Sequence, residues 1–155
     1  MPLVTLLCGP AGAGKTTHAR GLKRLGALRL SMDEAVWHDG WRDAQPPIER
    51  LHKLHRGLQQ QLTAAVRSGR DVVVDLSLAS RAVRDEWRTV AAAAAADVHL
   101  VVLTAPLEVL QRRMAARSGT GHPNAVRLSP QQLTDYLAGF DWPDSDEHPT
   151  VIRTG

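Results

Sequence analysis

The feature that most constrains this chain is a glycine-rich segment near its N-terminus, Gly9-Pro10-Ala11-Gly12-Ala13-Gly14-Lys15-Thr16. It matches the pattern G-x-x-x-x-G-K-[ST] at every fixed position. Small residues let successive backbone N–H groups turn toward one point, where they form a cradle for an anion. The segment follows an apolar run, Leu3 to Cys8, and precedes a helical stretch, Thr16 to Leu25, which is the context that the pattern requires. We therefore predict that it binds phosphate groups.

Individual positions of this phosphate loop have expected roles. The helix that follows adds the positive end of its dipole to the cradle. We expect Lys15 to reach the β- and γ-phosphates, and the Thr16 hydroxyl to coordinate Mg²⁺. Only three of the 19 basic residues are lysines, so composition does not explain a lysine here. The predicted contacts to the phosphates are Gly9, Ala11, Gly12, Ala13, Gly14, Lys15, Thr16 and Thr17.

Apolar runs and helical patterns alternate along the chain. Strands are expected at Leu3 to Cys8, Val72 to Asp75 and Val98 to Thr104, with shorter ones at Leu28 to Leu30 and Thr150 to Arg153. Helices are expected over Thr16 to Leu25, Pro46 to Ser68, Ser80 to Ala96, Leu107 to Arg117 and Ser129 to Gly139. Apolar runs without alternation are typical of strands buried on both faces of a parallel sheet. We predict one α/β domain over residues 1–155, with three layers and a mostly parallel sheet.

Composition excludes several classes of protein. Hydrophobic residues make up 43% of the 155 residues and charged residues 23%, which is sufficient for a packed core. The net charge of +3 permits a phosphate-rich ligand but does not by itself indicate nucleic acid. A single cysteine, Cys8, cannot form an intramolecular disulfide. No stretch is apolar over the length of a membrane span, and no basic residue precedes Lys15 as a secretory signal would require, so we expect a cytoplasmic setting.

Two acidic residues follow predicted strands. Asp33 comes after Leu28 to Ser31, and Asp75 ends another strand. Ligands of open parallel sheets bind beyond the carboxyl ends of the strands, so both carboxylates are expected near the phosphate loop. Asp33 is predicted to accept the proton of an acceptor hydroxyl; its alternative role is to cap the following helix. Asp75 is predicted to hold the metal or contact the substrate, and its alternative role is an anchor for the turn through Ser77 and Ser80.

Arginines gather in the last third of the chain. Between Val109 and Thr134 there is no acidic residue, yet this stretch contains Arg112, Arg113, Arg117 and Arg127. Arg113 and Arg117 are four residues apart, so a helix places them on one face. A glycine-containing loop follows, and we predict a movable lid over about residues 112–128 whose arginines stabilise phosphate charge. The alternative is a solvated basic helix face.

Aromatic residues on the acceptor side admit two interpretations. Trp37 and Trp41 are four residues apart and would share a helix face that contacts the substrate. Alternatively, the pair packs into the core, and Asp39-Gly40 would interrupt the helix. His52 and His55 lie three apart on a predicted helix, but no third ligand at suitable spacing is visible, so we expect no histidine-bound metal.

Four segments resemble the small P-loop kinases related to the polynucleotide kinase 5′-kinase domain, zeta toxins and chloramphenicol phosphotransferase. They are GPAGAGKTT (9–17), SMDE (31–34), VVVDLSLASRAVRDEWR (72–88) and TAPLEVLQRRMAAR (104–117), and FDWPDSDE (140–147) is similar to the closing segment of that group. The resemblance implies a five-stranded parallel sheet and ATP as phosphate donor. It also implies that Asp33 is the general base and that Arg113 and Arg117 serve the lid and the nucleotide. Arg81, in the third segment, is a predicted substrate contact.

The acceptor is less constrained than the donor. Leu76-Ser77 stands where polynucleotide kinases tend to have a polar Thr-Asn-like pair, and this departure favours another acceptor. The sequence predicts an ATP- and Mg²⁺-dependent kinase that phosphorylates a hydroxyl of a small molecule, such as a nucleoside, a sugar or an antibiotic-like alcohol. The alternatives are a 5′-hydroxyl polynucleotide kinase and a nucleotide-switched ATP-binding protein without transfer activity. No obligate protein partner is predicted.

Overall fold

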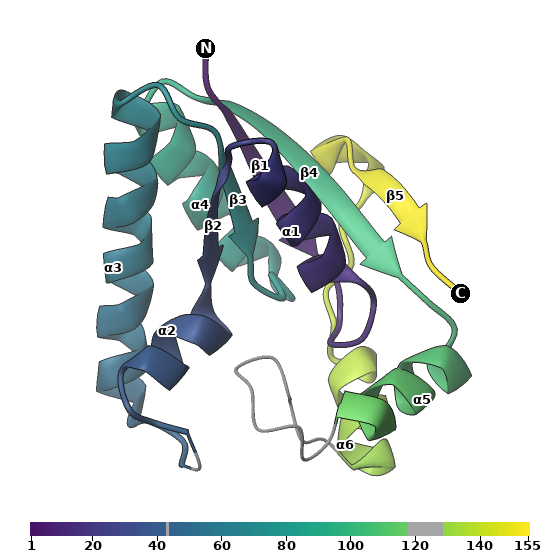
Figure 1. Ribbon diagram of the computed structural model, residues 1–155. Helices are drawn as coiled ribbons and strands as arrows, with labels where there is room; N and C mark the ends of the chain where they lie inside the picture. Colours follow the sequence, from purple (N-terminus) through teal and green to yellow (C-terminus); the bar gives the residue numbers. More distant parts are fainter. Residues whose placement is uncertain (43, 118–128) are drawn as a thin grey trace.

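A five-stranded parallel sheet forms the centre of the protein in the computed structural model, which describes residues 1–42, 44–117 and 129–155 (Figure 1). The strands are β1 (Leu3–Cys8), β2 (Leu28–Ser31), β3 (Val72–Asp75), β4 (Asp97–Thr104) and β5 (Thr150–Arg153). Their order across the sheet is β2-β3-β1-β4-β5, and every neighbouring pair is parallel. The expected α/β class and five-stranded parallel sheet are thereby confirmed.

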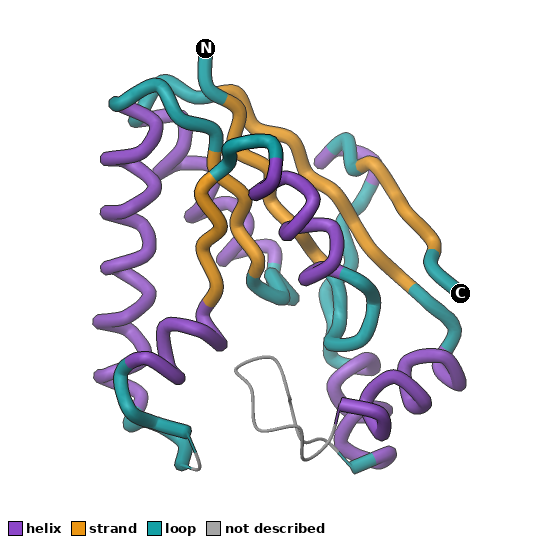
Figure 2. The backbone as a smooth tube through the Cα atoms, in the orientation of Figure 1, coloured by secondary structure: helices purple, strands orange, loops and turns teal. Residues whose placement is uncertain are grey.

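Helices cover both faces of the sheet (Figures 1 and 2). The helical elements are α1 (Lys15–Arg24), α2 (Met32–His38), α3 (Ile48–Arg67), α4 (Arg81–Ala93), α5 (Leu107–Arg117), α6 (Pro130–Ala138) and the 3₁₀ turn η1 (Ser145–Glu147). The helix α4 ends earlier than the alanine run predicts, because Ala95 adopts a positive φ of 64° that turns the chain toward β4. Within the described residues, no helix combines the length and apolarity needed to cross a membrane.

Alternate residues of β1 belong to two hydrophobic cores. Val4 and Leu6 pack with residues of α3 and α4, whereas Leu7 packs with residues of α1 and α5 on the opposite face. Both sets are fully buried, which explains why the sequence of this strand shows no alternation of polar and apolar residues. The three-layer arrangement follows from this double burial.

The register of the sheet determines which loops meet at its carboxyl edge. Leu7 of β1 and Ser31 of β2 both pair with Asp75 of β3, because β3 lies between the other two strands. The phosphate loop that follows β1 and the helix α2 that follows β2 therefore leave the sheet on either side of Asp75. Residues more than 40 positions apart in sequence share one end of the molecule (Figure 1).

Candidate active site

The phosphate loop connects the buried strand β1 to α1, as predicted. The helix begins at Lys15 after Gly14, whose φ of 102° lies in the left-handed region that favours glycine. Among the described residues, no side chain caps this helix and its first turn contains no acidic residue. Serine side chains, by contrast, cap α2, α4 and α6. The first-turn N–H groups of α1 are thus left for an anion.

Close packing and backbone geometry require glycine at two further loop positions. A Cβ on Gly9 would lie 2.3 Å from the carbonyl oxygen of Leu103, closer than two such atoms can approach. Gly12 has a φ of 86°. The Gly9 N–H donates to the Ser77 carbonyl (3.1 Å), which attaches the loop to the segment after β3. Lys15 Nζ donates to the Pro10 carbonyl (3.0 Å), so its ammonium lies over the loop.

A cavity of about 580 Å³ opens beside the loop and brings six predicted site residues together. Lys15 and Thr16 line it from the loop and α1, while Asp33 and Asp75 line it from the ends of β2 and β3. Ala11 and Gly12 complete the loop side. The carboxyl edge of the sheet therefore brings the loop lysine and the two carboxylates into one hollow, as the sequence predicts.

Asp33 lies in the first turn of α2 and faces the cavity, where its side chain is open to solvent within a concave surface. The surrounding protein desolvates the carboxyl and raises its pKa above the ordinary value, and the negative charge of Asp75 acts in the same direction. The ammonium of Lys15 opposes this rise. The alternative role of Asp33 as helix cap is wrong, because the Ser31 side chain is the cap and accepts from the Glu34 N–H.

Asp75 is buried and paired. Arg29 donates from Nε (2.9 Å) and Nη2 (2.6 Å) to Oδ2 of Asp75, and the guanidinium also binds Glu34. Both side chains of the Arg29–Asp75 pair are only 4% exposed. The predicted anchoring of Asp75 through Ser77 and Ser80 is not what holds it, because an arginine from the neighbouring strand supplies both hydrogen bonds.

The oxygen donors at this edge suit Mg²⁺. Within the described chain, no group of three or more His, Cys, Asp or Glu residues is arranged to hold a metal. Mg²⁺ does not need such a cage, because it is commonly held by one or two protein oxygens together with substrate phosphates and water. The Thr16 hydroxyl and the carboxylate of Asp75 line the cavity and provide oxygens of this kind.

Arg113 connects α5 to the phosphate loop. Its Nη1 donates to the Gly12 carbonyl (2.8 Å) and to Thr154 Oγ1 (2.9 Å), and Thr154 in turn donates to the Ala13 carbonyl (2.8 Å). Arg113 also lines a second cavity, of about 430 Å³, with Thr17, His18 and Ile152 among its walls. The side chain of Arg117, all of Arg127 and most of the expected lid fall outside the described residues.

The predicted aromatic face of Trp37 and Trp41 does not form. The helix α2 ends at His38, and Gly40 has a φ of 94°, so Trp41 follows the helix instead of extending it. Trp41 Nε1 donates to Asp39 (3.0 Å), and Trp37 lies under the guanidinium of Arg42 at 5.0 Å. Neither tryptophan is among the residues that line the cavity.

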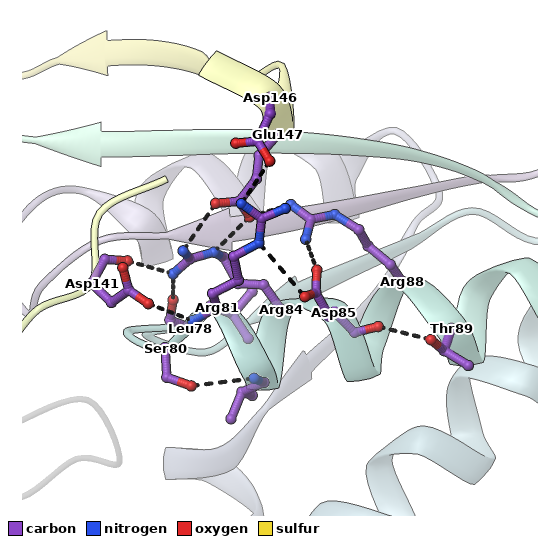
Figure 3. Close-up of polar contacts among 11 residues, drawn as sticks. Leu78, Ser80, Arg81, Arg84, Asp85, Arg88, Thr89, Asp141, Asp146 and Glu147 are labelled. Atoms are coloured by element: carbon purple, nitrogen blue, oxygen red, sulfur yellow. Dashed lines mark hydrogen bonds and ion pairs between the residues drawn. The ribbon is translucent and has the colours of Figure 1, made fainter. Parts of the chain in front are cut away.

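Arg81 is likewise not brought to the cavity. Its guanidinium forms ion pairs with Asp146 (2.7 Å) and Asp85 (3.6 Å), and in Figure 3 it lies with the acidic segment around η1. The prediction of a substrate contact is wrong for this side chain, because these nearby carboxylates hold its charge on another side of α4.

Two cavity residues, His55 and Tyr136, were missed by sequence reasoning. His55 comes from α3 and Tyr136 from α6. The sequence carried a usable signal for His55, since it lies four residues after Leu51 and three before Leu58, on the apolar face of the helix. Tyr136 is the only tyrosine of the chain and lies three residues after the buried Leu133.

A glycine-rich loop between a central parallel strand and an uncapped helix defines the P-loop NTPase class of protein. The chain belongs to the AAA domain family, whose model matches residues 4–143. A search of curated proteins found no significant relative.

Solved structures share the fold. A putative kinase from Chloroflexus aurantiacus superimposes with a TM-score of 0.75 at 20% identity, over 99% of this chain and 87% of that one. A gluconokinase from Sinorhizobium meliloti gives 0.63 at 21% identity, over 98% and 82%. A chain of the Pnkp1/Rnl/Hen1 complex gives 0.64 at 23% identity over 72% of this chain, and only 38% of its own length is covered. The resemblance to small P-loop kinases is thereby confirmed at the level of fold.

Proposed function

We propose that this protein is an ATP- and Mg²⁺-dependent kinase that transfers the γ-phosphoryl group to a hydroxyl of a small molecule. The observation that carries the proposal is the shared cavity of about 580 Å³, in which Lys15 and Thr16 of the phosphate loop face the carboxylate of Asp33. A phosphate-binding loop alone would serve any nucleotide-binding protein. A carboxylate across the same hollow, coupled electrostatically to the loop lysine, is what a hydroxyl acceptor requires.

In the proposed reaction, Asp33 orients the acceptor hydroxyl and takes its proton. The acceptor oxygen forms a bond to the γ-phosphorus as the bond from that phosphorus to the β–γ bridging oxygen breaks, and ADP leaves with the bridging oxygen. The raised pKa of Asp33 makes its carboxylate a stronger proton acceptor than an ordinary aspartate. Lys15 and the first-turn N–H groups of α1 hold the phosphates and stabilise the charge that develops on them.

Thr16 and Asp75 are the residues that we propose hold the metal, Asp75 directly or through water. Bound Mg²⁺ would neutralise charge between the β- and γ-phosphates. The Arg29 pair holds the Asp75 carboxylate at one position, so its free oxygen has a defined place at the cavity wall.

The nucleoside part of ATP is assigned to the second cavity. Both cavities border Gly12, the one described lining residue that they share. In-line transfer requires donor and acceptor to approach the γ-phosphorus from opposite ends. With the acceptor beside Asp33, the donor's base and ribose lie toward Thr17 and Arg113, the latter held against the loop by its hydrogen bond to Gly12.

Replacement of Asp33 by Asn tests the proposal. A screen of hydroxyl compounds for ATP consumption, read by the mass shift of the product, first identifies an acceptor. We expect D33N to retain nucleotide affinity and to lose transfer by about 10²-fold or more. Glu34→Gln is the matched control, because Glu34 lies in the same helical turn but binds Arg29 and does not line the cavity. Unchanged turnover in D33N would remove Asp33 from this role.

Two other functions make different predictions. A 5′-hydroxyl polynucleotide kinase would show steep salt dependence on oligonucleotides, because each neutralised phosphate releases counterions. A nucleotide-switched binding protein would hydrolyse ATP slowly and would transfer to no acceptor. The apolar residues that line the cavity, among them Leu76, Leu78 and Val83, support the small-molecule acceptor.

A further inference from the structure

The wall of the cavity is mostly apolar. Its apolar side chains include Met32, Leu76, Leu78, Ala79 and Val83. Among the described lining residues, the Lys, Arg, Asp and Glu side chains are Lys15, Asp33 and Asp75, which belong to the start of α1, the first turn of α2 and the end of β3. Most of the remaining lining is apolar.

The polar side chains of Ser77, Ser80, His55 and Tyr136 interrupt the apolar wall. His55 Nε2 and the Tyr136 hydroxyl are both buried, and neither has a hydrogen-bond partner among the described residues. The nearest carboxylate oxygen to His55 Nε2, in Glu86, is 3.9 Å away, which is too long for a hydrogen bond. Ser77 is near enough to lower the pKa of Tyr136, but the pair does not reach hydrogen-bond geometry.

Both groups are uncharged at neutral pH. Burial lowers the pKa of the His55 imidazole, and Glu86 only partly opposes this change. Burial also raises the pKa of the Tyr136 phenol, which keeps it protonated. Besides the Ser77 and Ser80 hydroxyls, the pocket thus offers two neutral hydrogen-bonding groups that have no partner among the described residues. A buried polar group without a hydrogen-bond partner is energetically unfavourable. Where such a group lies beside a cavity, a ligand bound in the cavity can supply the partner.

Resting on the proposed function, we infer that the acceptor is an uncharged, largely apolar alcohol with a second hydrogen-bonding group at its far end. His55 and Tyr136 are the specificity-determining residues that bind this second group, while Asp33 binds the reacting hydroxyl. A polyol would leave several hydroxyls without partners against the apolar wall. An anion at the far end would find no cation among the described residues that line it.

Three aromatic alcohols of matched shape test this inference. 4-(2-Hydroxyethyl)phenol carries the alcohol and a distal hydroxyl, 2-phenylethanol lacks the distal hydroxyl, and 4-(2-hydroxyethyl)benzoate replaces it with a carboxylate. Sorbitol is the neutral polyol. Binding of each probe is measured by titration calorimetry with the protein saturated with MgADP, and transfer from ATP is measured separately by product mass.

We expect the phenol to bind about tenfold more tightly than 2-phenylethanol, and the benzoate and sorbitol to bind at least tenfold more weakly than the phenol. Tyr136→Phe and His55→Phe should each lower the affinity for the phenol about five- to twentyfold and leave that for 2-phenylethanol unchanged. Both variants keep an aromatic ring against Phe140 or Trp87, so the melting temperature should be retained. His52→Phe, the same change at an exposed position of α3, is the control and should have no effect.

Equal affinity for all probes, preference for the benzoate or sorbitol, or binding of none would overturn the inference. If Tyr136→Phe and His55→Phe lower the affinity for 4-(2-hydroxyethyl)phenol and for 2-phenylethanol equally, the two residues have a structural role. That result would also overturn the inference. The proposed function fails separately. If the probes bind as expected but no acceptor is phosphorylated, the proposed kinase function is wrong and the assignment of the pocket remains. If phosphate is transferred to sorbitol in a reaction that depends on Asp33, the kinase function remains and the assignment of the pocket is wrong.

Discussion

Arg84 of α4 and Glu147 of η1 form a buried ion pair that ties the C-terminal segment to the wall of the cavity (Figure 3). Arg84 Nε and Nη2 donate to the two carboxylate oxygens of Glu147 at 2.9 and 3.0 Å. Nη1 of the same guanidinium donates to the carbonyls of Leu78 and Asp141. Leu78 lines the cavity and has a positive φ of 51°, so this arginine holds a strained residue in position.

Replacing Glu147 by Gln should destabilise the protein in a pH-dependent manner. Burial alone would raise the pKa of Glu147, but hydrogen bonds from Arg84 and Arg88 outweigh it and lower the pKa to about 2. The depressed pKa contributes stability that is present above the ordinary value of 4.5 and is lost as the pH falls toward 2. We expect E147Q to lower the free energy of unfolding by about 3 kcal/mol at pH 7, measured by urea denaturation.

The difference between E147Q and the parent protein should shrink as the pH falls toward 2. Asp146→Asn is the control, because Asp146 is exposed and, among the described residues, its ion pair is with the partly exposed Arg81; the substitution should cost less than about 0.5 kcal/mol. If E147Q loses the same free energy of unfolding at every pH, the shape of the Glu147 side chain and not its charge holds the C-terminal segment in place.

Asp33→Asn should stabilise the protein without ligand. The folded-state pKa of Asp33 lies above its ordinary value of 3.8, mainly because of desolvation, so ionised Asp33 opposes folding. This loss of stability from ionised Asp33 appears as the pH rises through 3.8 and is complete above the folded-state pKa. The melting temperature of D33N should therefore exceed that of the parent at pH 7, and the two should converge near pH 3. A lower melting temperature at pH 7 would show that the carboxylate is needed for the fold.

Arg29→Met should leave a buried carboxylate without its partner. Both side chains of the Arg29–Asp75 pair are almost inaccessible to solvent. Without the guanidinium, the Asp75 carboxylate would remain buried and its desolvation would no longer be compensated by the ion pair. We expect a loss of about 3 kcal/mol in urea denaturation at pH 7. Adding Asp75→Asn to this variant should recover part of the loss, and a double variant less stable than the single one would contradict this account.

Gly14→Ala should impair nucleotide binding. The residue has a φ of 102°, which alanine adopts only with strain, and it directly precedes the N–H groups that we propose bind phosphate. We expect MgATP affinity to fall at least tenfold in calorimetry. Gly21→Ala is the matched control in the same helix, since a Cβ there meets no atom within 4 Å and a helix interior favours alanine. Retained affinity in Gly14→Ala would argue against the loop as the phosphate site.

Cys8 should be inert toward thiol reagents in the folded protein. Burial raises its pKa to about 11, and its Sγ–H donates to the Leu78 carbonyl at 3.4 Å. The thiolate fraction at pH 8 is about a hundredfold below that of an ordinary thiol, and access is blocked as well. Labelling by iodoacetamide should require unfolding and should follow added urea; rapid labelling of the native protein would refute the packing described.

The local features of this protein were predictable because each depends on residues close in sequence. The sequence of the loop between Gly9 and Thr16 predicts its backbone conformation, because glycine permits the left-handed φ values that Gly12 and Gly14 adopt. The strands β1, β3 and β4 are visible as unbroken apolar runs, and α3 as a periodic apolar stripe. The end of α2 at His38 was indicated by Asp39-Gly40, which the sequence offers as an interruption of the tryptophan face.

The pairing of Asp75 and the remaining lining of the cavity were decided only by the tertiary structure. The order of the strands places Asp75 between the phosphate loop and Asp33 and brings Arg29 to it from 46 residues away. His55 and Tyr136 meet the same hollow from α3 and α6, 81 positions apart in the chain. No local sequence pattern predicts these contacts between distant residues, because they form only when the strands are arranged in their order in the sheet and helices cover both of its faces. The sequence by itself determined the loop that we propose binds phosphate, and the packing of distant helices decided which residues lie opposite it.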